Sequence, residues 1–235
     1  QVVSGYRRRI TEAPLAASGR LDLTTLEAAF SGPDRPRAYL LCSPHNPTGV
    51  VHTAAELAAV MELAARYDVQ VVVDEIHAPL VDPGTTFVPL LTVPGGERAV
   101  SVTSAGKTWN LAAFKAGLII AGTEATPLLQ KLPPLAQQST GHLANLAHTA
   151  ALISAQDWVD ELMVEVAANK RLLAAELATR VPAVRYEPQP GTYLAERLRA
   201  DWLRVLGKRR DWTSFERELP PLQQDDLEIR FYAWL

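Results

Sequence analysis

The chain has 235 residues, of which 48% are hydrophobic and 21% are charged. These ordinary values exclude an intrinsically disordered chain, which needs low hydrophobicity and a high net charge. The formal net charge is -3, so no strong positive field draws the chain to nucleic acid or to an anionic membrane surface. Cys42 is the only cysteine, which excludes an intrachain disulfide and zinc sites built from paired cysteines. No apolar run is long enough to span a membrane, and these bounds favour a cytoplasmic protein.

The first predicted unit is a strand, a helix and a second strand. Residues 38–42 (AYLLC) form a short apolar strand that ends at the turn SPHNPTG, because proline fixes φ and glycine permits a positive φ. Four of the five residues 69–73 are valine, which is apolar and β-branched, as in a strand of a parallel sheet that is buried on both faces. A strand–helix–strand unit of this length implies a parallel sheet.

The helix between these strands has a clear beginning. Thr53 is followed three residues later by Glu56, which is the spacing of a capping box. One face of the predicted helix then carries the apolar residues Leu57, Val60, Met61 and Ala64, and the helix is expected to end near Tyr67.

The remainder of the chain predicts shorter elements. Strands are expected over 99–103, 118–121 and 184–194, helices over 143–155 and 158–178, and loops over 82–96 and 104–117. The strand over 184–194 would begin a separate small subdomain. Residues 196–235 are rich in charge and have weak apolar periodicity, so they predict no definite element.

Polar side chains follow three successive predicted strands. Asn46 follows the first strand, Asp74 ends the second, and Ser104 and Lys107 follow the third. Ligands of open α/β sheets bind outside the carboxyl ends of the strands. An acid, an amide and an amine gathered there suit a cofactor with a ring nitrogen, a hydroxyl and an aldehyde, and pyridoxal phosphate (PLP) matches this set.

Three motifs carry a family resemblance. SPHNPTG, VVVDEIHAPLV and SAGKTWNLAAFKAG, in this order and with these separations, resemble the fold-type I, class I/II aminotransferase-like PLP enzymes. The DEIH and KTWNLA sequences are similar to those of the carbon–sulfur lyase branch, the cystathionine β-lyase-like proteins. The resemblance covers roughly residues 7–195.

The resemblance implies a role for each candidate site residue. Lys107 would bind the cofactor aldehyde and then act as the base at the substrate α-carbon. Asp74 would hold the proton on the pyridine nitrogen, and Asn46 would donate to the ring hydroxyl oxygen. His77 stands where transaminating relatives commonly carry a tyrosine that contacts the same oxygen, although a packed histidine is the alternative. Ser104 would contact the cofactor phosphate.

The chain departs from the family at both ends and at the phosphate site. Gly106 replaces a second hydroxyl residue of many relatives, and Lys115 stands where aminotransferases often carry a phosphate-binding arginine, which makes it a weaker anion partner. Nothing before Tyr6 supplies the family's phosphate cup or stacking aromatic residue, so we expect a chain cut at its N-terminus. Near the other end, Arg230 in LEIRFYA bears only a faint likeness to the substrate-carboxylate arginine.

The resulting prediction is an α/β fold, a three-layer sandwich with a mainly parallel sheet and a remnant of a small α+β C-terminal subdomain. Residues 1–155 would form the PLP-binding large domain, and residues 156–235 the linking helix and partial subdomain. The expected function is PLP-dependent carbon–sulfur β-lyase activity on a small amino-acid substrate, carried out by a homodimer, without a metal. Two alternatives stay open: a PLP-dependent aminotransferase, and a catalytically inactive truncated remnant.

Overall fold

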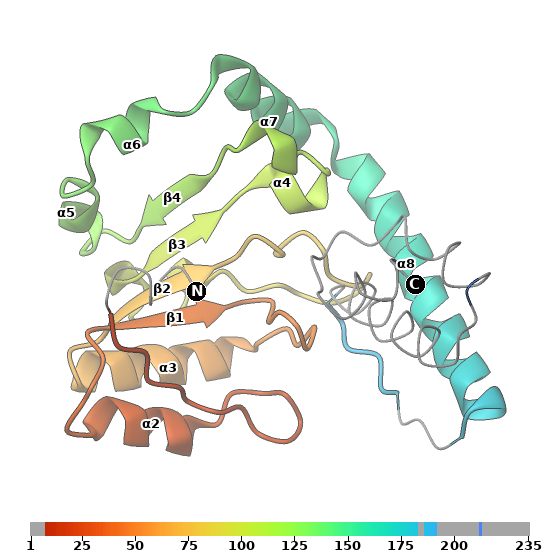
Figure 1. Ribbon diagram of the computed structural model, residues 1–235, viewed down its shortest axis with the longest axis horizontal. Helices are drawn as coiled ribbons and strands as arrows, with labels where there is room; N and C mark the ends of the chain where they lie inside the picture. Colours follow the sequence, from red (N-terminus) through yellow and green to blue (C-terminus); the bar gives the residue numbers. More distant parts are fainter. Residues whose placement is uncertain (1–7, 183–185, 192–211, 213–235) are drawn as a thin grey trace.

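The fold is built on one mainly parallel sheet. The computed structural model describes residues 8–182, 186–191 and 212. Within this part of the chain the sheet has the strand order β1-β2-β3-β4 (Figure 1). The strands are β1 (Ala38–Cys42), β2 (Gln70–Asp74), β3 (Val100–Thr103) and β4 (Leu118–Ala121). The first three are mutually parallel and β4 pairs antiparallel with β3, which confirms the predicted α/β class and the mainly parallel sheet.

The helix α3 (Ala54–Arg66) joins β1 to β2 and begins as predicted. The side chain of Thr53 accepts a hydrogen bond from the Glu56 N–H, and the Glu56 carboxylate accepts one from the Thr53 N–H. Each partner therefore satisfies a backbone donor that a helix end would otherwise leave unpaired. The helix ends at Arg66 with Tyr67 as its C-cap, close to the predicted end, and Asp68 follows with a positive φ of 53°.

A second helix, α2 (Leu23–Ser31), packs beside α3 on one face of the sheet (Figure 1). It begins at Asp22, whose carboxylate accepts from the N–H groups of Thr24 and Thr25. Sequence analysis did not predict this nine-residue helix. The core between the helices and the sheet is made of large apolar side chains, among them Leu26, Phe30, Leu57, Val60, Val71 and Val73.

The opposite face of the sheet is more open. The strand register places Leu40, Val72, Val102 and Ile119 on this face. Leu40 is 62% exposed and Ile119 is 47% exposed. In the part of the chain that the structure describes, these apolar side chains therefore lack the helical cover that protects the other face.

The remaining helices follow β4. The predicted helices are confirmed as α7 (His142–Ser154) and α8 (Gln156–Arg180). Shorter pieces within segments expected as loops are α4 (Ala105–Thr108), η1 (Leu90–Thr92) and η3 (Ala112–Phe114), and η2 (Gly96–Arg98) begins at the end of such a segment. Two more short helices follow β4, namely α5 (Thr126–Leu129) and α6 (Pro134–Gln138). Elements of three to five residues are too short to show a helical period. No helix among the described residues is long and apolar enough to cross a membrane.

The strand predicted over 184–194 is wrong where the structure describes it. Residues 186–190 form no strand, and Gly191 makes only an isolated antiparallel bridge with Val81. The backbone groups here find partners on separate segments instead: the Pro190 carbonyl accepts from the Asp82 N–H, and the Gly191 N–H donates to the Gly49 carbonyl. Residues 184, 185 and 192–194 lie outside the described residues, as does 196–235 except for Trp212.

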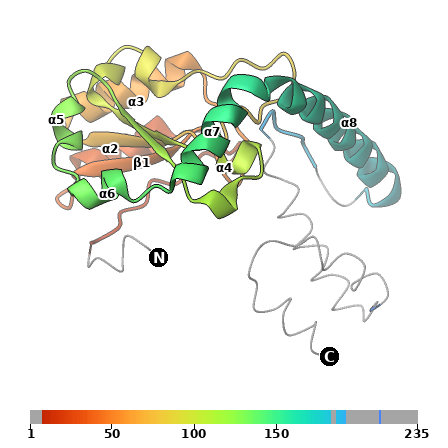
Figure 2. The same cartoon turned by 90° about the horizontal axis from the view of Figure 1, so that it is seen from above.

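A buried lysine on α8 supplies the other partners of this segment. Lys170 is only 8% exposed, and its ammonium lies 2.5 Å from an Asp82 carboxylate oxygen. The same ammonium donates to the carbonyls of Gln189 and Gly191, at 2.8 and 3.1 Å. One charge therefore joins α8, the loop after β2 and the segment 186–191. Helix α8 lies to one side of the sheet in both views (Figures 1 and 2).

A substitution of Lys170 tests how much this side chain contributes to the free energy of unfolding. We expect Lys170→Met to lower the free energy of unfolding by about 3 kcal/mol, because the poorly exposed Asp82 carboxylate would lose its counter-charge. The matched control is Arg171→Met, which removes an exposed cation from the next position of the same helix and should change stability by less than about 0.5 kcal/mol. Urea denaturation measures both, and equal effects of the two variants would contradict this assignment.

Candidate active site

The carboxyl ends of β1, β2 and β3 meet at one edge of the sheet, on the side where α4 lies (Figure 1). Asp74 is the last residue of the central strand of these three, and the register pairs it with Cys42 of β1 and Val102 of β3. The parallel register therefore brings the predicted site residues, which are far apart in sequence, to the same edge.

Asp74 presents its carboxylate to the outside. Its side chain is exposed, and one carboxylate oxygen accepts the Ile76 N–H at 3.0 Å. This bond turns the chain immediately after β2, so that the following residues return into the protein. The carboxylate is fixed in orientation and accessible to a ligand.

His77 lies close to both Asp74 and Lys107. Burial lowers the pKa of its imidazole, the neighbouring Asp74 carboxylate raises that pKa, and the nearby Lys107 ammonium lowers it. Because both charges act on the same buried ring, the acid, the imidazole and the amine form one cluster. Burial is the largest effect, and it favours the neutral imidazole at neutral pH.

Lys107 stands on the short helix α4, and Ser104 closes the loop around it. The Ser104 hydroxyl caps α4 by accepting the Gly106 N–H at 2.9 Å, and it donates to the Ala116 carbonyl at 2.7 Å. Lys107 itself is exposed. Since the serine proton is already donated to Ala116, a phosphate contact would require the hydroxyl to leave that carbonyl; the predicted contact stays a prediction.

The glycine that departs from the family pattern has a local reason. A Cβ atom at Gly106 would lie 3.0 Å from the Ser104 hydroxyl oxygen, closer than most real contacts of a Cβ atom. A second hydroxyl residue at this position would crowd the cap of α4.

Asn46 lies on the other side of Asp74, in the turn after β1, and is half-buried. Its backbone N–H faces the Cys42 thiol and lowers the pKa of that thiol, but burial outweighs this effect, and the Asp74 charge adds to burial, so the pKa of Cys42 is raised. Cys42 is therefore a protonated thiol at neutral pH and is not a candidate nucleophile.

Glu75 is a site-supporting residue that sequence analysis missed. It is only 6% exposed, and its carboxylate accepts from the Leu90 N–H at 2.7 Å and from the Ser101 hydroxyl at 2.6 Å. Burial raises the pKa of this carboxyl, while the two hydrogen bonds lower it. The signal in the sequence was an acidic residue directly after a buried strand, next to Asp74.

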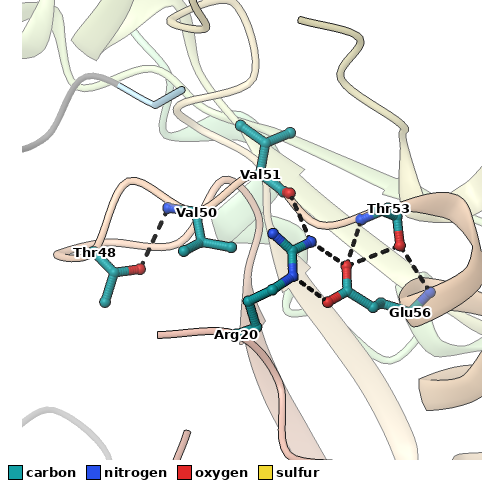
Figure 3. Close-up of polar contacts among 6 residues, drawn as sticks. All are labelled: Arg20, Thr48, Val50, Val51, Thr53 and Glu56. Carbon is teal, nitrogen blue, oxygen red and sulfur yellow. Dashed lines mark hydrogen bonds and ion pairs between the residues drawn. The ribbon is translucent and has the colours of Figure 1, made fainter. Parts of the chain in front are cut away.

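A polar network fixes the chain between the Asn46 turn and α3 (Figure 3). The Arg20 guanidinium forms a two-point ion pair with Glu56 and also donates to the Val51 carbonyl at 3.2 Å. The hydrogen bonds from Arg20 and Thr53 lower the pKa of Glu56 to about 2. Thr48 supports the turn itself, because its hydroxyl accepts the Val50 N–H at 3.3 Å.

The two remaining candidates are Lys115 and Arg230. Lys115 is exposed and has a positive φ of 55° at the end of η3. Arg230 falls outside the described residues. Among the described residues no group of three or more metal-ligating side chains is found.

Comparison with known proteins places the chain in a family. Residues 1–216 match the family described as aminotransferase class I and II. The chain belongs to this family. The match confirms the resemblance that the three sequence motifs carry.

Individual relatives point to one branch. A Mycobacterium leprae protein named "Putative cystathionine beta-lyase" is 49% identical over 80% of this chain and 48% of its own length. The Corynebacterium glutamicum cystathionine beta-lyase is 32% identical over 80% of this chain and 49% of its own length. The crystal structure of a "putative plp-dependent beta-cystathionase" from Corynebacterium diphtheriae superposes with a TM-score of 0.73 and 31% identity, over 82% of this chain and 50% of that one. The chain thus spans about half the length of these relatives.

His52 gives the site region a pH-dependent stability. Its side chain is 1% exposed, and burial, the largest effect, lowers the pKa of the imidazole to about 4. The unfolded chain binds this proton near pH 6.5, so lowering the pH from 6.5 to 4 favours unfolding, by about 3 kcal/mol in full. We expect His52→Leu to lose this part of the pH dependence.

Urea denaturation between pH 4 and pH 7 measures the effect, with the exposed His142→Gln as the matched control. The control should keep the pH slope of the unchanged protein. If His52→Leu kept that slope as well, the buried imidazole would not be its source.

Proposed function

We propose that the protein containing this chain is a PLP-dependent carbon–sulfur β-lyase. Its reaction would be α,β-elimination from L-cystathionine or a similar cysteine S-conjugate, which with one water yields a thiol, pyruvate and ammonia. The observation that carries the proposal is the cluster of Asp74, His77 and Lys107 at the carboxyl edge of the sheet, within a chain whose relatives carry the cystathionine beta-lyase name.

The chemistry of the donor set fits PLP. Asp74 offers an exposed carboxylate for the ring nitrogen and Lys107 an exposed amine for the aldehyde. Asn46, in the half-buried turn beside Asp74, offers an amide for the ring hydroxyl. When bound, PLP supplies an electron-withdrawing ring that takes up the electron pair left by a broken substrate bond.

Each residue of the chain would then have a distinct task. The Lys107 amine would take the proton from the substrate Cα, and the Asp74 carboxylate would hold the proton at the ring nitrogen. The neutral His77 imidazole would contact the cofactor oxygen. The Ser104 bonds that close the loop around Lys107 keep the amine near these partners.

The first test locates the cofactor linkage. After incubation with PLP and reduction with borohydride, peptide mapping should find the label on Lys107. Lys107→Ala should lose the label, whereas Lys115→Ala, an exposed lysine of the same loop, should keep it. Labelling at another lysine would contradict the site assignment, and no labelling at all would favour the inactive-remnant alternative.

The second test distinguishes the reactions. Pyruvate should appear from L-cystathionine without any added oxo acid, because elimination needs no amino-group acceptor. Lys107→Ala should lower the rate of pyruvate release by roughly 100- to 10,000-fold, which is the usual contribution of a general base to the rate. A coupled lactate dehydrogenase assay measures the release, and turnover that needs an oxo acid and yields no pyruvate would contradict the lyase.

An aminotransferase is the second candidate. The family description itself supports it, as does a 33% identity over 173 residues with a Mycobacterium tuberculosis protein named "Probable N-succinyldiaminopimelate aminotransferase DapC". Both reactions begin with removal of the same substrate proton, so the cluster around Lys107 serves either one. The higher identity to the lyase-named relatives favours elimination.

The proposed function includes an oligomeric state and a cellular location. We propose a homodimer in the cytoplasm, with residues 1–155 as the large domain and 156–235 as the linking helix and subdomain. Support for association comes from apolar side chains exposed on β4 and α7, which would favour burial against another chain. They are Leu118, Ile119, Ile120, Leu143, Leu146 and Ile153.

A further inference from the structure

A cavity of about 640 Å³ lies at the edge of the sheet opposite to the candidate active site. Its lining includes Arg35, Arg37, Asp68, Arg98 and Lys131. Small-molecule sites commonly have volumes of about 300–1,000 Å³. None of the candidate catalytic residues lines this cavity, so the proposed lyase function leaves it without a role.

The topology explains why these cations meet. Arg37 directly precedes β1 and Arg98 lies just before β3, so both stand at the amino ends of parallel strands. The antiparallel β4 runs back to the same edge, where Ala121 pairs with Val100, and it delivers the segment that contains α5 and Lys131 (Figure 1). Strand β2 separates this edge from Asp74 by about 13 Å.

The cavity concentrates positive charge in a chain that is negative overall. Its three arginines and one lysine face a single carboxylate, that of Asp68, whereas the whole chain has a formal charge of -3. Grouping like charges in a hollow costs free energy unless an anion occupies it.

The protein neutralises these cations poorly. Among the described residues, the only ion pair that involves a lining residue joins Arg98 and Asp68 at 3.9 Å. The Arg35 guanidinium donates to the uncharged Tyr67 carbonyl at 3.4 Å. Within the described ranges, the Arg37 and Lys131 side chains make no ion pair or hydrogen bond. At least two cations are therefore available to a ligand.

We propose that this cavity binds a small phosphate-bearing molecule with two or more negative charges. Guanidinium groups match phosphate oxygens with two parallel hydrogen bonds, and lysine adds a point charge. The volume exceeds that of a single phosphate group, so it has room for an organic part as well. The site is separate from the predicted cofactor site and does not depend on the lyase assignment.

Inorganic pyrophosphate is the probe, and isothermal titration at constant ionic strength is the measurement. Saturable binding at one site per chain is expected. Arg37→Ser with Lys131→Ser should raise the dissociation constant at least about tenfold, because charge-assisted hydrogen bonds are lost. Both side chains are exposed, so the fold should persist, and circular dichroism checks this.

Three controls make the result decisive. Arg171→Ser removes an exposed cation far from the cavity and should change the dissociation constant less than twofold. Ser104→Ala, in the predicted cofactor site, should also leave it unchanged. Tricarballylate, a carboxylate anion of similar charge, should bind at least fivefold more weakly than pyrophosphate.

Several outcomes would overturn the proposal. One is the absence of saturable binding. A second is equal weakening by Arg171→Ser, which would show a general charge effect. Loss of binding in Ser104→Ala alone would assign the probe to the cofactor site, and equal affinity for tricarballylate would remove the preference for phosphate.

Discussion

Parallel pairing places the carboxyl ends of β1, β2 and β3 at one edge of the sheet and their amino ends at the opposite edge. The rest of the molecule is arranged around this pairing. Cys42 stands opposite Asp74, and Asp74 opposite Val102, so the turns that carry Asn46, Asp74 and Lys107 leave the sheet at the same edge. A shift of the register by one residue would turn Asp74 to the other face of the sheet. The buried apolar residues of β2, Val71 and Val73, hold that register because they pack against α2 and α3.

Local polar networks then orient each turn at that edge. Glu75 ties the turn after β2 to Ser101 of the neighbouring strand and to the Leu90 N–H. The Arg20–Glu56 pair ties the connection after β1 to the start of α3. Ser104 closes the loop that carries Lys107. None of these groups is a reacting group in the proposed chemistry. Glu75 and Ser104 orient the segments that carry the acid and the amine beside the buried His77 ring, and the Arg20–Glu56 pair orients the chain after the Asn46 turn.

The two ends of the parallel strands differ in the charged side chains that they carry. The carboxyl edge combines Asp74 and Lys107 around a neutral imidazole, whereas the amino edge gathers an excess of cations around one carboxylate. The antiparallel direction of β4 makes this possible, since it returns Lys131 to the amino edge instead of the carboxyl edge. A parallel fourth strand would have placed that lysine on the side of the candidate active site.

The sequence by itself determined the strand–helix–strand unit, the helices α7 and α8, and the membership of the family. These features depend on neighbours along the chain: the Thr53 capping box, the apolar period and the three motifs are all local. Only the tertiary structure decided the partners of Lys170, the position of Glu75 and the absence of a strand over 186–190. The sequence predicted a strand over 184–194, but in the structure the carbonyls of Gln189 and Gly191 accept hydrogen bonds from the Lys170 ammonium of α8. Contacts of this kind depend on which distant segments the strand register and the helix packing bring together, and no spacing along the chain records that.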